Sequence, residues 1–155
     1  MSRADPHITH YRQEAGVDAA LPRVSVVMPT YNRAHFLPGA FDAIRAQTLQ
    51  DFELVIVDDG STDDTAEVLP GLIEQLTQPV TVVRQANGGV GRARNTGVDH
   101  ARCELIAFFD SDDRWLPHHL SDCVSGLERE PEVDWVFGAG RRVAAETGRV
   151  LIEHS

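Results

Sequence analysis

The chain has 155 residues, 42% of them hydrophobic, and carries 24 acidic against 14 basic residues, a formal charge of −10. This size and composition suit one soluble domain with its own core, and the negative charge excludes non-specific nucleic-acid binding, which needs a basic face. No apolar run approaches the roughly 20 residues of a membrane span, and the N-terminus lacks the apolar core of a signal peptide. With Cys103 and Cys123 expected to be free thiols, we predict a cytoplasmic protein, free in solution or peripheral at the inner face of the membrane.

Residues 1–22 are polar and unpatterned and are expected to form a mobile tail ahead of a single domain over residues 23–155. From residue 23 onwards, short apolar runs alternate with helical patterns. The predicted strands are 24–28, 52–57, 80–83 and 105–109, and the predicted helices are 36–44, 61–69, 90–101 and 117–130.

Three local signals set expected boundaries of these elements. Pro29 is expected to stop the first strand, because proline has no N–H for the ladder. Ser61 or Thr62 is expected to cap the second helix, and Pro70-Gly71 to interrupt it.

The alternation of strands and helices predicts an α/β sandwich around a mostly parallel sheet, and ligands of such sheets bind beyond the carboxyl ends of the strands. Three of the predicted strand ends carry unusual chemistry, at residues 29–33, 58–61 and 110–113. Because parallel strands bring these ends to one edge of the sheet, we expect a single ligand site that combines aromatic, amide and carboxylate groups.

Asp110, Asp112 and Asp113 place three carboxylates within four residues at the end of an apolar strand. Such a concentration of negative charge favours a hard divalent cation, Mg²⁺ or Mn²⁺, which also binds phosphate oxygens. The alternative is a solvated acidic turn in which Asp112 or Asp113 caps the next helix.

Tyr31 and Asp59 offer the groups that recognise a nucleotide base. An aspartate can accept a hydrogen bond from a ring N–H, and a tyrosine can stack on the ring. The alternatives are a tyrosine at the edge of the core and, for Asp58 and Asp59, a turn or cap pair.

The glycine-rich segment before the third predicted helix contains Gly88, Gly89 and Gly91, but a dinucleotide-binding spacing fails at Arg94. We expect a flexible loop that lets the helix start approach phosphates, with Arg92 and Arg94 supplying positive charge. The alternative is an ordinary loop with surface arginines.

Taken together, residues 24–33, 53–65 and 87–97 and the acidic strand end resemble the family 2 glycosyltransferases, in that order, over about residues 23–138. The resemblance implies the GT-A fold, a Rossmann-like α/β/α sandwich. It also implies inverting transfer of a sugar from a nucleotide-diphospho-sugar, a UDP-sugar above all, with Mn²⁺ or Mg²⁺. The acceptor stays open among glycans, lipids and small molecules.

Carried over by position, the resemblance assigns Pro29, Tyr31 and Asp59 to the base and ribose, and Arg94 to the diphosphate or the sugar-nucleotide region. Asp112 and Asp113 would serve ribose and metal, supported by Asp110. The expected donor-binding residues are Pro29, Thr30, Tyr31, Asn32, Asp58, Asp59, Arg94 and Asp112, and the expected metal ligands are Asp110, Asp112 and Asp113.

The chain also departs from the family, whose members continue into an acceptor half with a general base. Here residues 142–152 resemble a hairpin turning at Thr147-Gly148, and neither Glu146 nor Glu153 stands in the context of that base. We therefore expect a domain truncated on the acceptor side that docks with a missing segment or self-associates. The alternatives are a non-catalytic nucleotide-sugar- or partner-binding module and, less favoured, a sugar nucleotidyltransferase.

The aromatic residues after the acidic motif also leave two interpretations. Trp115 and His118-His119 are expected to be a packed tryptophan and helix-surface histidines rather than the lining of a sugar pocket.

Overall fold

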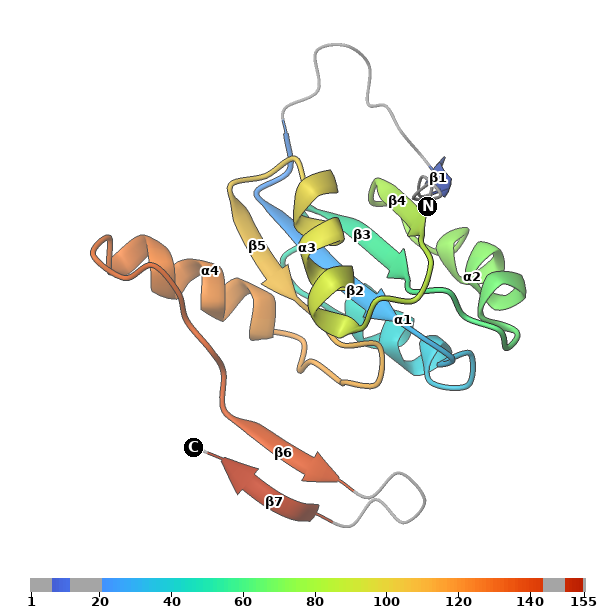
Figure 1. Ribbon diagram of the computed structural model, residues 1–155. Helices are drawn as coiled ribbons and strands as arrows, with labels where there is room; N and C mark the ends of the chain where they lie inside the picture. The colour runs from blue at the N-terminus through green and yellow to red at the C-terminus, as the bar shows by residue number, and fades with distance from the viewer. Residues whose placement is uncertain (1–6, 12–20, 144–149, 155) are drawn as a thin grey trace.

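Figure 1 shows the computed structural model of the protein, which describes residues 7–11, 21–143 and 150–154. One sheet has the strand order β1-β4-β3-β2-β5, in which all neighbouring pairs are parallel except β1 with β4. Its strands are β1 (His7–Tyr11), β2 (Val24–Thr30), β3 (Phe52–Asp58), β4 (Val80–Arg84) and β5 (Leu105–Phe108). The helices are α1 (Leu37–Arg45), α2 (Thr65–Ile73), α3 (Val90–His100) and α4 (His119–Arg129).

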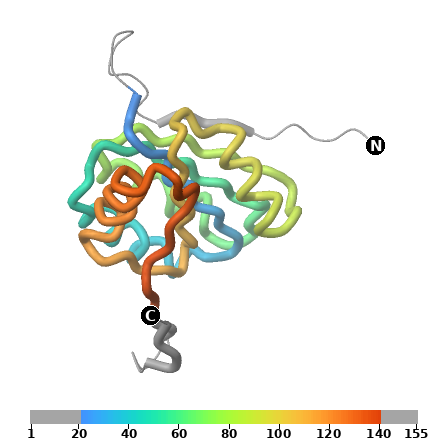
Figure 2. Tube along the Cα trace, turned by 90° about the vertical axis from the view of Figure 1, so that its left-hand side faces the viewer, coloured from blue at the N-terminus to red at the C-terminus, as the bar shows by residue number. Residues whose placement is uncertain are grey.

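The helices cover both faces of this sheet, which confirms the predicted α/β sandwich. The main core joins apolar side chains of β2 and β3 to α1, α2 and the start of α4, with Phe41 and Phe52 fully buried within it. On the opposite face α3 lies across β2 and β3 (Figure 1). Ala93 of this helix packs against Val57. Figure 2, turned by 90° from this view, follows the trace of residues 21–140 in colour.

Pro29 lies inside β2 and does not stop it, so the sequence-based boundary is wrong for the strand as a whole. The register with β3 continues through Pro29 and Thr30. The ladder with β5, by contrast, ends after the pair Val27–Phe108, where Phe109 N–H donates to Val27 O at 3.0 Å. Alternate residues of a strand bond to opposite neighbours, so the missing N–H of Pro29 falls on the β5 side. Beyond this point β2 and β5 are no longer joined.

The N-terminal region differs from the sequence-based expectation at one place. Within the expected tail, His7–Tyr11 pairs antiparallel with β4, from His7 opposite Arg84 to Tyr11 opposite Val80. A five-residue strand without alternating apolar residues leaves no clear local signal, and its pairing depends on the open edge that β4 presents.

The second helix also differs from the prediction. It begins at Thr65 with Asp64 at its N-cap, so neither Ser61 nor Thr62 caps it, and the Ser61 hydroxyl instead accepts from the backbone N–H of Asn32 (3.0 Å). It then continues through Pro70 to Ile73 without a break.

Two further strands, β6 (Gly140–Val143) and β7 (Val150–His154), form the expected antiparallel hairpin. Its predicted turn, Thr147-Gly148, lies outside the described residues. Within the described part of the chain, no helix combines the length and apolar character needed to cross a membrane. Cys103 and Cys123 are free thiols, as expected.

Candidate functional site

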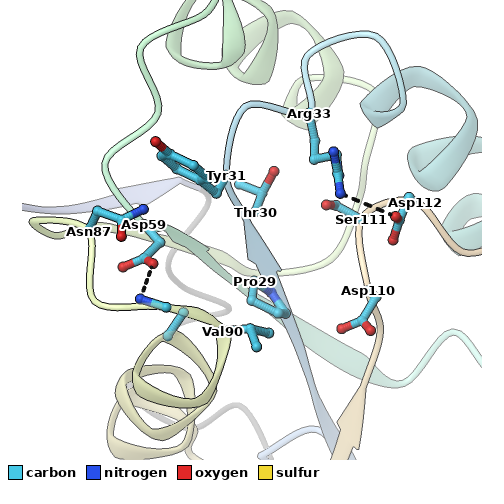
Figure 3. A pocket seen from close by; sticks show the side chains of 12 residues that line it. Pro29, Thr30, Tyr31, Arg33, Asp59, Asn87, Val90, Asp110, Ser111 and Asp112 are labelled. Carbon is cyan, nitrogen blue, oxygen red and sulfur yellow. Dashed lines mark hydrogen bonds and ion pairs between the residues drawn. The ribbon is translucent and has the colours of Figure 1, made fainter.

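A cleft of about 460 Å³ opens at the carboxyl ends of β2, β3 and β5, where β2 and β5 separate (Figure 3). The expected site residues that line it are Pro29, Thr30, Tyr31, Asp59, Asp110 and Asp112. The remaining lining residues are Arg33, Asn87, Gly89, Val90, Ala93 and Ser111. The end of the β2–β5 ladder at Pro29 therefore makes room for this cleft.

Asp59 lies at the end of β3, is only 3% exposed and is almost fully hydrogen-bonded. Its Oδ1 accepts from Gln85 Nε2 at 2.7 Å and from Gly88 N–H at 2.9 Å, and its Oδ2 accepts from Gly89 N–H at 2.8 Å. The carboxylate thus holds the glycine-rich loop that leads into α3.

Asn32, Asp58 and Arg94, all expected to bind the donor, are not among the residues that line the cleft. Asn32 has a positive φ of 52°, and its Oδ1 accepts from Thr62 N–H at 2.8 Å. Asp58 accepts from Ser61 N–H at 2.8 Å and lies 3.5 Å from Arg84. Asn32 thus fastens the loop after β2 to the loop after β3, whereas Asp58 closes the turn that follows its own strand, which is the turn role that sequence reasoning left open for it.

The acidic strand end is balanced by arginines from two other elements. Arg94 on α3 donates through Nη2 to both oxygens of Asp110, at 2.7 and 2.9 Å. Arg33, in the loop after β2, lies 3.7 Å from Asp112, and both side chains are 44% exposed. These pairings let two carboxylates face one cleft without an unbalanced charge.

The assignment of Asp110, Asp112 and Asp113 to a metal ion stays a prediction, because the described side chains do not form a complete metal site by themselves. Among the described residues, no group of three acidic, histidine or cysteine side chains is arranged to hold a metal ion. Asp113 does not line the cleft, and partial burial together with the charges of Asp110 and Asp112 raises its pKa. Asp110 is occupied by Arg94.

Asp112 nevertheless suits a divalent cation that is shared with a ligand. Mg²⁺ is commonly held by one or two carboxylates plus substrate phosphates rather than by an all-protein cage. Asp112 lines the cleft, is half exposed and, among the described residues, forms one ion pair, the long contact to Arg33. The donor set therefore fits a cation that takes its other ligands from a bound diphosphate and water.

Two buried polar atoms at the site have no hydrogen-bond partner among the described residues: Thr30 Oγ1 and Arg94 Nε. Thr30 is 3% exposed and lines the cleft. A buried hydroxyl without a partner costs free energy, and such atoms are typical of ligand sites.

Trp115 is packed and His118 is exposed, as expected, whereas His119 is partly buried rather than at the surface, and none of the three lines the cleft. The Trp115 ring lies 4.6 Å from that of Phe109 and 4.8 Å from that of His119. Partial burial lowers the pKa of His119, against the opposing charge of Asp122.

The sequence analysis assigned no role to Arg33, Asn87 or Ser111, although all three line the cleft. Each of the three is adjacent to a residue to which the sequence analysis did assign a role. The signal that could have found them was therefore the whole polar segment after each strand rather than its individual residues.

A mostly parallel α/β sheet with acidic and aromatic groups at its carboxyl edge is the architecture of the GT-A glycosyltransferases. The model of Glycosyl transferase family 2 matches residues 25–151, and the chain belongs to that family.

Curated relatives and solved structures agree with this assignment. The chain is 44% identical over 102 residues to an uncharacterized glycosyltransferase of Nostoc sp., covering 66% of this chain and 32% of that one. It is 40% identical over 112 residues to the succinoglycan biosynthesis protein ExoW of Rhizobium meliloti, covering 70% and 35%. It spans about a third of the length of these relatives.

Among solved structures, the mannosyltransferase PcManGT of Pyrobaculum calidifontis, in complex with GDP-Man and Mn²⁺, matches with TM-score 0.64 and 32% identity, covering 70% of this chain and 33% of that one. TarS of S. aureus in complex with UDP-GlcNAc matches with TM-score 0.62 and 30% identity, covering 70% and 32%.

Proposed function

We propose that this chain binds a nucleotide-diphospho-sugar, most favourably a UDP-sugar, in the cleft, and that the protein transfers the sugar to an acceptor with inversion. The observation that carries the proposal is one cleft that joins Tyr31 and Asn87 at one end to Asp110 and Asp112 at the other. The complexes of related structures with UDP-GlcNAc and with GDP-Man and Mn²⁺ support a donor of this class.

Different residues of the cleft would bind different parts of the nucleotide-diphospho-sugar. Tyr31, 45% exposed, offers its ring for stacking on the base, and Thr30 Oγ1 offers an unused hydroxyl. Asp112 would hold Mn²⁺ or Mg²⁺, and the bound cation would supply positive charge to the diphosphate. Arg33 and Arg94 bring fixed positive charge to the same end of the cleft, which an anionic ligand needs in a chain of charge −10.

In the proposed reaction an acceptor hydroxyl forms a bond to the anomeric carbon, while the bond from that carbon to the diphosphate oxygen breaks. The proton of the hydroxyl passes to a general base on the face opposite the diphosphate. Asp59 and Asp110 are already hydrogen-bonded within the protein. Among the described residues, we assign none to the general base.

A non-catalytic donor-binding module is the second candidate. It is favoured by the pairing of every cleft carboxylate: Asp59 with amides, and Asp110 and Asp112 with arginines. A sugar nucleotidyltransferase would instead need a glycine-rich, basic loop directly after β2, where this chain has Pro29, Thr30 and Tyr31.

Calorimetry with UDP, GDP, dTDP and CDP, each with and without Mn²⁺, tests donor binding. We expect UDP to bind more tightly with Mn²⁺, and chelation to reverse the gain. Binding of no nucleotide would overturn the proposal. Release of UDP from UDP-sugars, with and without a panel of acceptors, then separates the transferase from the non-catalytic module.

A further inference from the structure

The wall of the cleft beside α3 is a loop with little support of its own. It runs from Gln85 at the end of β4 to Gly89, which caps α3 with a positive φ of 84° and no side-chain hydrogen bond. Asn87 and Gly89 of this loop line the cleft. Gly88 and Gly89 have no side chains that could anchor the loop, so its shape depends on contacts made by its backbone.

Asp59 provides those contacts. Its two oxygens accept the N–H groups of Gly88 and Gly89, and Oδ1 also accepts Gln85 Nε2. A carboxylate has about four acceptor sites, and Gly88 N–H approaches Oδ2 as well, at 3.2 Å. Little capacity is left for a base N–H, so Asp59 acts first as an anchor for the loop.

The charge of Asp59 is buried, and no cationic side chain among the described residues pairs with it. Its carboxylate oxygens therefore receive their hydrogen bonds from the three N–H donors, and Gln85 is the only side chain among these three. Gln85 is 7% exposed and is itself fixed, because its Oε1 accepts from Thr96 Oγ1 of α3 at 2.6 Å. The hydrogen bonds thus run from Thr96 through Gln85 to Asp59 and on to the loop.

The loop is also held on its other side. Gly60, directly after Asp59, has a φ of 79°, and a Cβ there would lie 2.9 Å from Asn87 N and 3.2 Å from Gln85 O. The turn after β3 and the loop after β4 are therefore in close contact, and a small rotation of Asp59 would move the cleft wall.

We propose that Gln85 and Thr96 are positioning residues for nucleotide binding: they hold the Asp59 carboxylate, and through it the Gly88-Gly89 wall, in the shape that receives the donor. This inference rests on the proposed function. It assigns a role to two side chains that do not line the cleft themselves.

The Gln85→Glu variant tests this proposal through the pH dependence of UDP binding, which a purely structural role of Gln85 would not change. A glutamic acid at this position can donate to Asp59 only when protonated, and burial next to a carboxylate raises its pKa. Besides Asp59, the titratable or charged side chains that the described residues place nearest to Gln85 and Thr96 are Asp58 and Arg84, which pair with each other, and His100 of α3, whose Nδ1 lies 2.8 Å from Thr96 O.

We expect the variant to bind UDP nearly as well as wild type near pH 5, and at least about tenfold more weakly than wild type near pH 8. Both proteins are titrated with UDP by calorimetry at each pH. Because variant and wild type are compared at the same pH, any change in the protonation of UDP affects both equally. Gln75→Glu, which makes the same substitution at an exposed position after α2, is the matched control and should follow wild type.

Thr96→Val and Thr96→Ser test the hydrogen bond from Thr96 to Gln85, the first of the hydrogen bonds that connect α3 to the loop. Valine has the shape of threonine without the hydroxyl and should weaken UDP binding, whereas serine keeps the donor to Gln85 and should restore it. Amide exchange of Gly88 and Gly89 should be faster in the valine variant.

The two proposals fail in different ways. If wild-type protein binds no nucleotide, the proposed function is wrong and the positioning role with it. If wild type binds UDP and Gln85→Glu shows the wild-type pH profile, the proposed function survives and the role of Gln85 and Thr96 is overturned.

Discussion

Arg94 on α3 binds both carboxylate oxygens of Asp110 at the end of β5, through Nη2 at 2.7 and 2.9 Å. This pair crosses from the helix on one face of the sheet to the acidic strand end. It has two consequences: Asp110 is not free to act as a simple metal ligand, and the guanidinium is held next to the cleft with its Nε unpartnered.

Replacing Arg94 by glutamine should therefore impair binding more than folding. The pair is more than a third exposed, so we expect the free energy of unfolding to change by no more than about 1 kcal/mol. Loss of a charge-assisted contact to the diphosphate should weaken UDP binding by roughly 1.5–3 kcal/mol. Arg129→Gln, which removes the same charge from an exposed position at the end of α4, is the control. Equal affinities of the two variants in calorimetry would show that the Arg94 charge does not act on the ligand.

Asp112→Asn should abolish the part of UDP binding that depends on Mn²⁺. A ligand at a hundred times its dissociation constant stabilises the folded state by about 2.7 kcal/mol, which a thermal-shift assay detects easily. Wild type should show a larger shift for UDP with Mn²⁺ than for UDP alone, and the variant should show the same shift in both. Asp99→Asn removes one negative charge from an exposed position of α3 and should retain the wild-type response. A Mn²⁺-dependent shift in the Asp112→Asn protein would exclude Asp112 as the ligand.

His119 predicts a pH dependence of stability. Burial lowers its pKa in the folded protein, so folding favours the neutral ring. The corresponding stability is fully present above the unfolded value of about 6.5 and is lost as the pH falls through the folded value. Wild type should lose free energy of unfolding between about pH 7.5 and pH 5.5, and His119→Gln should lose less. Urea unfolding at both pH values measures this, and an identical pH difference in the two proteins would count against it.

The sequence predicted much of this fold because its signals are local. Runs of apolar residues, the helical spacing of Phe41 and Ile44, and the polar strand ends are all visible within ten residues. Parallel strands then brought Tyr31, Asp59 and Asp112 to one cleft, as expected.

What the sequence did not predict depends on which elements are neighbours. Gln85 binds a carboxylate 26 residues away, and Thr96 binds Gln85 only because α3 packs beside the end of β4. Nor does the sequence say where a polar side chain at a strand end is directed. Asn32 faces the neighbouring loop, whereas the nearby Arg33 lines the cleft.

The position of α3, which carries Arg94 and directly follows the Gly88-Gly89 loop, depends on close contact with β2 at Gly97. A Cβ at this glycine would lie 2.3 Å from Val27 Cγ1. Val27 is fully buried and β-branched, so its side chain has little freedom to move aside. Gly97→Ala should therefore lift α3 from the sheet and cost about 1–3 kcal/mol of unfolding free energy, as overpacked cores do.

Gly91→Ala is the matched substitution on the same helix. No atom lies within 4 Å of a Cβ at Gly91, and replacing a helical glycine by alanine stabilises a helix by about 0.5–1 kcal/mol. Urea unfolding should thus give opposite signs for the two variants. UDP titration adds the functional test, because a displaced α3 moves Arg94 and the Gly88-Gly89 loop together, so only Gly97→Ala should weaken binding. If Gly97→Ala were as stable as wild type and bound UDP equally well, the close packing of α3 on β2 would not be what positions this side of the cleft.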